Sequence, residues 1–310
     1  MTKPKVTVVG SFNTDLLIRT PRMPVKGETI LGGPFLTGPG GKGANQAVAA
    51  ARLDADVTMV VKLGQDAFGD QAAANLAKEG ISPDFVLRDA TSHTGVAFII
   101  VDDDGENMIV VASGTNDLLT PADVAVAQEA IASADVVVLE LESPIETVEH
   151  AVRMAHEAGV TVLLNPAPGQ LLSDELLSMV DVLTPNQTEL QIVAGKIDLT
   201  GLEEVESAAR DLLSHGVGTV VVTLGADGAL IVTPESAQHV PGYKVDVVDT
   251  TGAGDAFNGA LAVALAEGKA LPEAVRFANA AAALQVTKVG TAPAMPYRAD
   301  VVALLNETAR

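Results

Sequence analysis

The sequence predicts an α/β protein in which helices flank a doubly wound, mostly parallel sheet. Three observations lead to this prediction. Short β-branched runs alternate with Ala- and Leu-rich segments along most of the chain, as in sheets whose strands are joined by right-handed crossovers. Polar residues recur directly after the predicted strands, at Asn13, Glu142, Asn186, Thr223 and Asp249. One region breaks the alternation and indicates a second, smaller β-sheet.

Composition is consistent with one domain over residues 1–310, because no linker, low-complexity tract or internal repeat divides the chain. The absence of cysteine excludes disulfides, thiolate metal sites and cysteine nucleophiles. A net charge of −21 argues against nucleic acid and anionic membranes as partners. The negative net charge does not exclude ATP as a ligand, since a phosphate site needs only a local positive field from a helix N-terminus, a lysine and a metal ion. The apolar run within residues 1–10 is too short for a signal-peptide core, and no apolar run approaches the length of a membrane span, so we expect a cytoplasmic protein.

The first strand is predicted at residues 5–10, with polar residues at its carboxyl end. Ligands of open α/β sheets bind at that end. Asn13 and Asp15 alternate on an extended backbone and could face one bound polyol; a simple Asx turn is the alternative.

Residues 16–37 carry three prolines and three glycines and lack the usual crossover helix. Residues 94–112 resemble a hairpin across the Asp-Asp-Asp-Gly turn at 102–105. We expect these two segments to pair in a small lid-like sheet inserted in the α/β core.

The stretch at residues 38–46 is a glycine-rich loop that opens into a helix from about residue 47. It is not a Walker A loop, because Lys42 is followed by Gly43 instead of Ser or Thr. It matches G-x-G-x-x-G formally, but it does not follow the first strand and lacks an acidic residue about 20 positions on, so a dinucleotide site is disfavoured. We expect it to carry Lys42 and Asn45 toward a polar ligand.

The rest of the chain follows a regular strand–helix rhythm. Predicted strands lie at 57–62, 135–139, 161–164, 182–184 and 219–223, and predicted helices at about 67–79, 144–158 and 202–214. The polar residues after these strands would all lie along one edge of the sheet, where a ligand could bind.

The turn at residues 249–258 organises the chain. It separates a predicted strand at 243–248 from a predicted helix at 256–266. The unpaired N–H groups at the start of such a helix favour an anion, and glycines let the backbone approach it closely. Asp255 beside that anion site could take a proton from a hydroxyl group that attacks phosphorus. It could also be only an N-cap.

Two motifs together resemble the ribokinase family of carbohydrate kinases: Gly-Gly-Lys-Gly-Ala-Asn-Gln-Ala at 40–47 and Asp-Thr-Thr-Gly-Ala-Gly-Asp-Ala-Phe-Asn-Gly-Ala at 249–260. Their order and separation match as well. Segments 13–15, 141–144, 165–168 and 184–189 also resemble that family, so the likeness runs nearly end to end.

The resemblance implies ATP-dependent phosphorylation of ribose at O5, with Mg²⁺ and an activating K⁺. Asp255 would be the base, and Gly252, Ala253 and Gly254 the anion hole. Ribose would be held by Asn13, Thr14, Asp15, Gly41, Lys42, Gly43, Asn45 and Glu142. The ATP site would be lined by Asn186, Thr223, Leu224, Gly225, Ala226, Asp227, Gly228, Gly254 and Asn279. Glu189 would organise Mg²⁺ through water. Potassium would lie at Asp249, Thr251, Gln285, Lys288, Gly290 and Ala294, mostly bound through backbone carbonyls, and Ala294 replaces a common Ser. At the ATP site, Asn279 replaces a His of some relatives.

Several alternatives stay open. The same chemistry could act on deoxyribose, fructose, adenosine or pseudouridine. A binding or sensor protein could have kept the fold and lost turnover, although the intact turn at 252–255 argues against this. An NAD-dependent dehydrogenase is a third alternative. The resemblance also implies a homodimer formed through the lid, with a monomer as the alternative.

Overall fold

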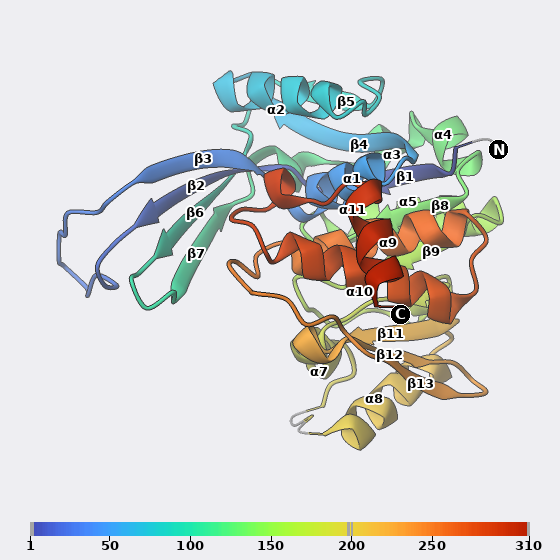
Figure 1. Cartoon of the computed structure of the whole chain (residues 1–310). Helices are drawn as coiled ribbons and strands as arrows, with labels where there is room; N and C mark the ends of the chain where they lie inside the picture. The colour runs from blue at the N-terminus through green and yellow to red at the C-terminus, as the bar shows by residue number, and fades with distance from the viewer. Residues whose placement is uncertain (1–2, 197–198, 200, 309–310) are drawn as a thin grey trace.

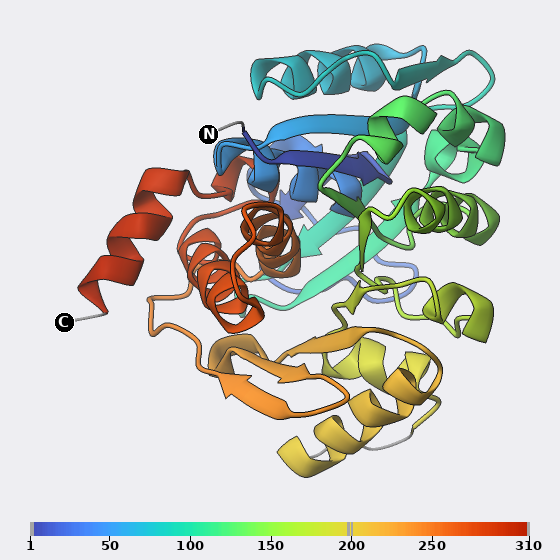
Figure 2. The ribbon, with the colours of Figure 1, turned by 90° about the vertical axis from the view of Figure 1, so that its right-hand side faces the viewer.

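The computed structural model describes residues 3–196, 199 and 201–308. Its main body is a nine-stranded sheet with helices on both faces (Figures 1 and 2). The strand order is β13-β12-β11-β10-β9-β8-β1-β4-β5, and all neighbours are parallel except at the β11–β12–β13 edge. This sheet is formed by β1 (Lys5–Val9), β4 (Asp56–Gly64), β5 (Val86–Asp89), β8 (Val136–Leu139), β9 (Thr161–Leu164), β10 (Val182–Leu183), β11 (Thr219–Thr223), β12 (Ala229–Val232) and β13 (Ala237–Val240).

Two apolar layers bury the faces of the sheet. Residues of one strand alternate between them, because successive side chains point to opposite faces: Val136 and Val138 join one cluster, Val137 and Leu139 the other. The first layer is covered by α1 (Lys42–Arg52), α2 (Ala67–Lys78), α9 (Ala253–Ala266), α10 (Leu271–Gln285) and α11 (Arg298–Glu307). The second is covered by α3 (Pro121–Ala125), α4 (Gln128–Ala132), α5 (Ile145–Glu157), α6 (Asp174–Leu177), α7 (Gln187–Val193) and α8 (Leu202–Ser214). Short 3₁₀ helices lie at Gly114–Leu118, Gly225–Asp227 and Ala292–Ala294.

A second sheet of four strands projects from the body, in the order β3-β2-β6-β7 (Figure 1). It contains β2 (Asn13–Arg19), β3 (Phe35–Gly40), β6 (Gly95–Val101) and β7 (Asn107–Ala112). The predicted fold class, with its large parallel sheet and small additional sheet, is thereby confirmed. β2 begins at Asn13, shortly after β1 ends at Val9. The residues at 13–15 that are predicted to bind the sugar therefore lie where the chain passes from the large sheet to the small one.

One predicted strand is wrong. Residues 243–248 alternate in character, yet they form no strand, because no neighbouring strand pairs with their backbone. Instead, the N–H groups of Val248 and Asp249 both donate to the Val286 carbonyl at the end of α10. This segment therefore reaches the start of α9 as an extended connection fastened to α10. Across the described residues, no helix combines the length and apolar character that a membrane span requires.

Candidate active site

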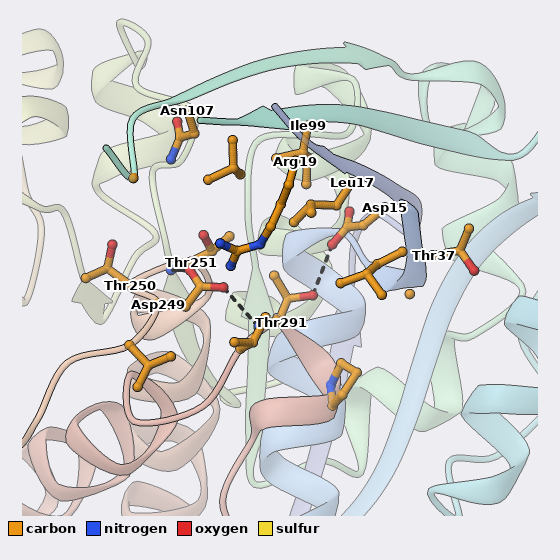
Figure 3. A pocket seen from close by; sticks show the side chains of 18 of the residues that line it. Asp15, Leu17, Arg19, Thr37, Ile99, Asn107, Asp249, Thr250, Thr251 and Thr291 are labelled. Atoms are coloured by element: carbon orange, nitrogen blue, oxygen red, sulfur yellow. Dashed lines mark hydrogen bonds between the residues drawn. The ribbon is translucent and has the colours of Figure 1, made fainter. Parts of the chain in front are cut away.

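Two neighbouring cavities flank the loop that precedes α9, and the smaller one lies at the carboxyl ends of β9, β10 and β11. The larger, of about 440 Å³, opens beneath the small sheet and is lined by Asp15, Arg19 and Thr291 among others (Figure 3). The smaller, of about 150 Å³, contains Lys42 and Asp255. Thr250 lines both, so the two spaces meet at the loop that precedes α9. The arrangement offers one compartment on each side of that loop.

The N-terminus of α9 provides the predicted anion site. Gly252 is its N-cap, in a left-handed conformation with φ of 88° that favours glycine. Among the described residues, the N–H groups of Gly254 and Asp255 have no backbone acceptor, as expected for a first helical turn. The N–H of Ala253 differs, because it donates to the Thr250 carbonyl at 3.2 Å. A side chain at Gly254 would meet open space, so its backbone is accessible from the smaller cavity.

Asp255 is held by two amide groups of helix α1. Asn45 Nδ2 donates to its Oδ2 at 2.8 Å, and Gln46 Nε2 donates to its Oδ1 at 3.2 Å. Burial raises the pKa of Asp255 to about 6, while Lys42 and the two amide donors oppose that rise. The N-cap alternative for this residue does not hold, since Gly252 caps the helix and Asp255 lies inside it. An oriented carboxylate with a pKa near neutrality suits a general base.

The pKa of Asp255 predicts the acidic limb of the pH profile. A base works in its ionised form, so kcat/KM should rise with pH through about 6 and level off above neutrality. Initial rates measured across the pH range at low sugar concentration check this. Activity that stays flat down to the ordinary pKa of an aspartate, 3.8, would contradict the assignment.

Lys42 is the positive centre of the smaller cavity. Burial alone would lower the pKa of its ammonium group, but the carboxylates of Asp255, Glu142, Glu189 and Glu140 outweigh burial and raise it. Lys42 is therefore protonated at neutral pH, as an anion-binding residue must be.

A second cluster of polar groups is assembled around Glu142. Its Oε2 accepts hydrogen bonds from Ser11 Oγ at 2.6 Å, from Asn13 Nδ2 at 3.3 Å and from the Lys42 N–H at 3.1 Å. The close packing depends on glycine: a Cβ at Gly41 would lie 2.5 Å from the Asn13 nitrogen. The structure thus brings the predicted sugar residues of β2, α1 and the β8 end together.

Asp15 faces the larger cavity from β2. Burial raises its pKa to about 7, a hydrogen bond from Thr291 lowers it, and the charges of Glu142 and Asp255 raise it further. Thr291 Oγ1 donates to Asp15 Oδ2 at 3.1 Å, as Figure 3 shows. Thr14, by contrast, alternates to the other face of the strand and lines neither cavity. Of the predicted sugar residues, Asp15 lines the larger cavity, and Lys42 and Asp255 line the smaller one. The others line neither cavity: Asn13, Thr14, Gly41, Gly43, Asn45 and Glu142.

The predicted nucleotide residues extend from the smaller cavity along the ends of β10 and β11. Asn186 and Glu189 form a capping box at the start of α7, with Asn186 Oδ1 accepting from the Glu189 N–H at 2.8 Å and Glu189 Oε2 accepting from the Asn186 N–H at 2.9 Å. Asn186, Glu189 and Thr223 line the cavity. Burial raises the pKa of Glu189, against the effect of Lys42.

The loop Leu224–Gly228 follows β11 and contains the 3₁₀ helix Gly225–Asp227. Gly228 has φ of 95°, and a Cβ there would lie 2.2 Å from the Val240 carbonyl oxygen. Asn279 is buried on α10 and donates to the carbonyls of Val240 at 3.1 Å and Pro241 at 3.2 Å. Its amide nitrogen is therefore engaged by the backbone, which leaves its oxygen for a ligand.

The predicted potassium positions meet where the loop before α9 contacts the end of α10. Asp249 accepts from the N–H groups of Thr251 and Gly290, and Gln285 donates to their carbonyls. Ala294 is buried and contributes no side-chain oxygen, and the Lys288 side chain is exposed. The described residues hold no group of three His, Asp or Glu that could bind a metal ion on their own.

Glu140 and Gln46 are among the polar residues of the site that were not predicted. Glu140 is fully buried at the end of β8 and accepts from the N–H groups of Ser11 and Glu142, both at 2.6 Å. Its pKa is raised to about 8, chiefly by burial. Gln46 belongs to the glycine-rich motif, but its role in orienting Asp255 emerges only from the tertiary contact. A carboxylate inside a run of buried valines was the one sequence signal for Glu140.

Comparisons with known proteins agree with this geometry. The model of the pfkB family of carbohydrate kinases matches residues 3–298. A ribokinase from Haemophilus influenzae is 42% identical over 97% of this chain and 98% of its own. A deoxyribokinase from Salmonella typhi is 39% identical over 94% of this chain and 95% of its own. Among solved structures, Arabidopsis thaliana ribokinase complexed with ribose and ATP superposes with a TM-score of 0.90 at 35% identity, covering 98% of this chain and 99% of that one.

Proposed function

The chain belongs to the pfkB family of carbohydrate kinases, and from that membership we infer that it transfers the γ-phosphoryl group of ATP to O5 of ribose. The observation that supports the chemistry best is the position of Asp255 in the first turn of α9. Its carboxylate is held by Asn45 and Gln46, and free N–H groups lie beside it. A base and an anion site at one point suit the transfer of a phosphoryl group to a hydroxyl.

The proposed reaction uses these groups in order. Asp255 accepts the proton of the sugar 5-hydroxyl. At the same time the sugar O5 bonds to the γ-phosphorus, and the bond between that phosphorus and the bridging oxygen breaks, so that the oxygen leaves with ADP. The backbone N–H groups of Gly252, Gly254 and Asp255 donate hydrogen bonds to the negatively charged oxygens of the phosphoryl group during transfer. Lys42, which lines the same cavity, compensates that charge.

Substrate contacts are proposed on the same basis. Asn13, Asp15, Glu142, Asn45 and Lys42 hold the sugar, with the backbone at Gly41 and Gly43 fitting closely around it. The nucleotide is proposed to lie along Asn186, Thr223, the loop Leu224–Gly228 and Asn279. For the sugar, Asp15 in the wall of the larger cavity and Lys42 in that of the smaller one support these assignments. For the nucleotide, Asn186 and Thr223 line the smaller cavity at the ends of neighbouring strands.

Magnesium fits the site as a substrate-bound ion. Among the described residues, Glu189 Oε1 has no hydrogen-bond donor while Oε2 completes the capping box, so one carboxylate oxygen can hold a water ligand of the ion. Mg²⁺ commonly retains several waters and binds through one or two carboxylates and the phosphates. When bound, it would neutralise charge on the phosphate oxygens. Potassium fits less well, because side chains already pair the backbone groups at its predicted position, and no step of the proposed reaction depends on it.

Ribose should be preferred over 2-deoxyribose if Asp15 accepts a hydrogen bond from the vicinal hydroxyls. A buried carboxylate left without that partner is penalised, so we expect kcat/KM to be about 10–10²-fold higher for ribose. Asp15→Ala should bring the ratio of the two sugars toward one, while Asp246→Asn, on the exposed connection, should leave it unchanged. A coupled assay with ribose, deoxyribose, fructose and adenosine measures these ratios. No turnover with any of them would overturn the proposed function.

Deoxyribose phosphorylation is the second candidate, because the deoxyribokinase from Salmonella typhi is nearly as similar to this chain as the ribokinase from Haemophilus influenzae. The same panel separates the two. A higher kcat/KM for deoxyribose would assign the chain to that activity and remove the proposed role of Asp15.

A homodimer through the small sheet is also proposed, with that sheet acting as a lid in a single-domain chain. The face of the sheet turned away from the cavity exposes Phe35, Phe98, Met108 and Val110, each more than half exposed. Apolar patches of this kind mark association sites. Light scattering should give twice the chain mass, and Phe98→Asp should reduce it to one chain; an unchanged mass would contradict the interface. A cytoplasmic location stays a prediction from the sequence.

A further inference from the structure

Gln285, the last residue of α10, is fully buried beneath the loop that precedes α9. Its side-chain nitrogen donates to the carbonyl oxygen of Thr251 at 2.6 Å and to that of Gly290 at 3.0 Å. Both carbonyls belong to the set predicted to ligate potassium. An amide NH₂ group has two donors and no acceptor on nitrogen. It therefore satisfies both oxygens at once, from the place that a cation bridging them would occupy.

Asp249 completes the arrangement from the other side. Its Oδ1 accepts from the Thr251 N–H at 2.9 Å, and its Oδ2 accepts from the Gly290 N–H at 2.9 Å. Each of the two linked residues thus has its N–H paired with Asp249 and its carbonyl paired with Gln285. Buried backbone polar groups need such partners. Here two side chains supply them, and the loops are joined without an ion.

The link acts directly on the anion site. Gly252 follows Thr251 and caps α9, and a Cβ built on Gly252 would lie 3.4 Å from Gln285 Nε2. The Gln285 amide therefore lies directly against the residue whose φ of 88° turns the N–H groups of α9 toward the smaller cavity. Fixing the Thr251 carbonyl fixes the start of that turn. Positioned donors of this kind matter because they must not reorganise during the reaction.

We propose that the side-chain amide of Gln285 takes the place of a monovalent cation, so that turnover in this protein is independent of potassium. The inference rests on the proposed kinase function. It makes Gln285 a positioning residue, which acts on the phosphoryl group through the loop 249–252. The neighbouring positions agree with it, since Ala294 lacks a side-chain oxygen and Lys288 adds a positive charge to the segment after α10 that carries Gly290.

The orientation of the amide defines the competing model. Oε1 of Gln285 is buried and has no hydrogen-bond partner among the described residues. A flipped amide would place this oxygen against the two carbonyl oxygens, which is repulsive unless a cation lies between the three. In that case Gln285 would be a potassium ligand, and its removal would weaken the response to potassium instead of creating one.

The test compares potassium chloride with tetramethylammonium chloride at equal ionic strength. The wild-type protein should give the same kcat with ribose and MgATP in both salts. Gln285→Ala should lose about tenfold or more in kcat without potassium, since the anion-site donors lose their support. Potassium should restore much of that loss, because the variant opens space between the Thr251 and Gly290 carbonyls. Gln238→Ala, on exposed β13, should behave as wild type.

Thermal unfolding gives a readout without turnover. Potassium should raise the Tm of Gln285→Ala and leave the wild-type Tm unchanged. Gln285→Met keeps the side-chain volume but removes the donors, so it should lose turnover without recovery by potassium. A wild-type kcat that falls sharply without potassium, or a Gln285→Ala variant with full, salt-independent turnover, would overturn the proposal. Absence of sugar phosphorylation by the wild type in either salt would instead count against the proposed function, and the Tm comparison would still stand.

Discussion

Asp255→Asn should lower kcat by about 10²–10⁴-fold, the usual contribution of a general base. The amide has nearly the same size but cannot accept the proton of the sugar hydroxyl. Binding should change little, because one side-chain oxygen remains to accept from Asn45 or Gln46. Rapid-mixing turnover combined with equilibrium binding of ribose and ATP separates the two effects.

Folding of this variant is checked by its Tm, and Asp246→Asn is the matched control that removes an exposed carboxylate outside both cavities. The control should retain wild-type kinetics. A near-normal kcat in Asp255→Asn would show that another group takes the proton, and a loss confined to ribose binding would make Asp255 a substrate contact only.

Lys42→Met should lower kcat/KM for ATP by about 10²–10³-fold, because the cavity loses a positive charge where the phosphoryl group becomes more negative. Four carboxylates act on this ammonium group: Asp255, Glu142, Glu189 and Glu140. Without it, their mutual repulsion is uncompensated and the anion site becomes less favourable for phosphate.

We also expect Lys42→Met to change the pH dependence of kcat/KM. Lys42 holds the pKa of Asp255 down, so its removal should raise that pKa and move the acidic limb of kcat/KM to higher pH. Lys244→Met, an exposed lysine outside the two cavities, serves as the control. Kinetics and a pH profile that match the wild type would make Lys42 a bystander of the reaction.

Much of the fold could be predicted because periodicity is local. The pattern over Leu202–Ser214 gave the bounds of α8 directly, since an amphipathic helix shows its buried face in the sequence. Residues 243–248 show the limit of that approach. Alternation indicates a strand only if a neighbouring strand pairs with the segment, and no strand of either sheet pairs with residues 243–248.

The candidate site, like the fold, could be predicted from the sequence only in part. The turn before Asp255 and the loop around Lys42 carry glycine patterns that are visible in the sequence. The contacts that orient these residues join distant positions, such as Gln46 with Asp255 and Thr291 with Asp15, 209 and 276 residues apart. No local pattern encodes such pairs. Gln285 shows a further limit, because the sequence pointed mostly to backbone carbonyls at the potassium positions and gave no sign that the Gln285 side-chain nitrogen donates to the carbonyls of Thr251 and Gly290.

The central claim is that the Asp255 carboxylate receives the proton of the sugar hydroxyl at the start of α9. A crystal structure with ribose and a non-hydrolysable ATP analogue measures this most directly. The Asp255 oxygen should lie about 2.6–3.2 Å from the ribose O5, with the γ-phosphate against the N–H groups of Gly254 and Asp255. An Asp255 side chain turned away from O5, with another group in contact with that hydroxyl, would contradict the account.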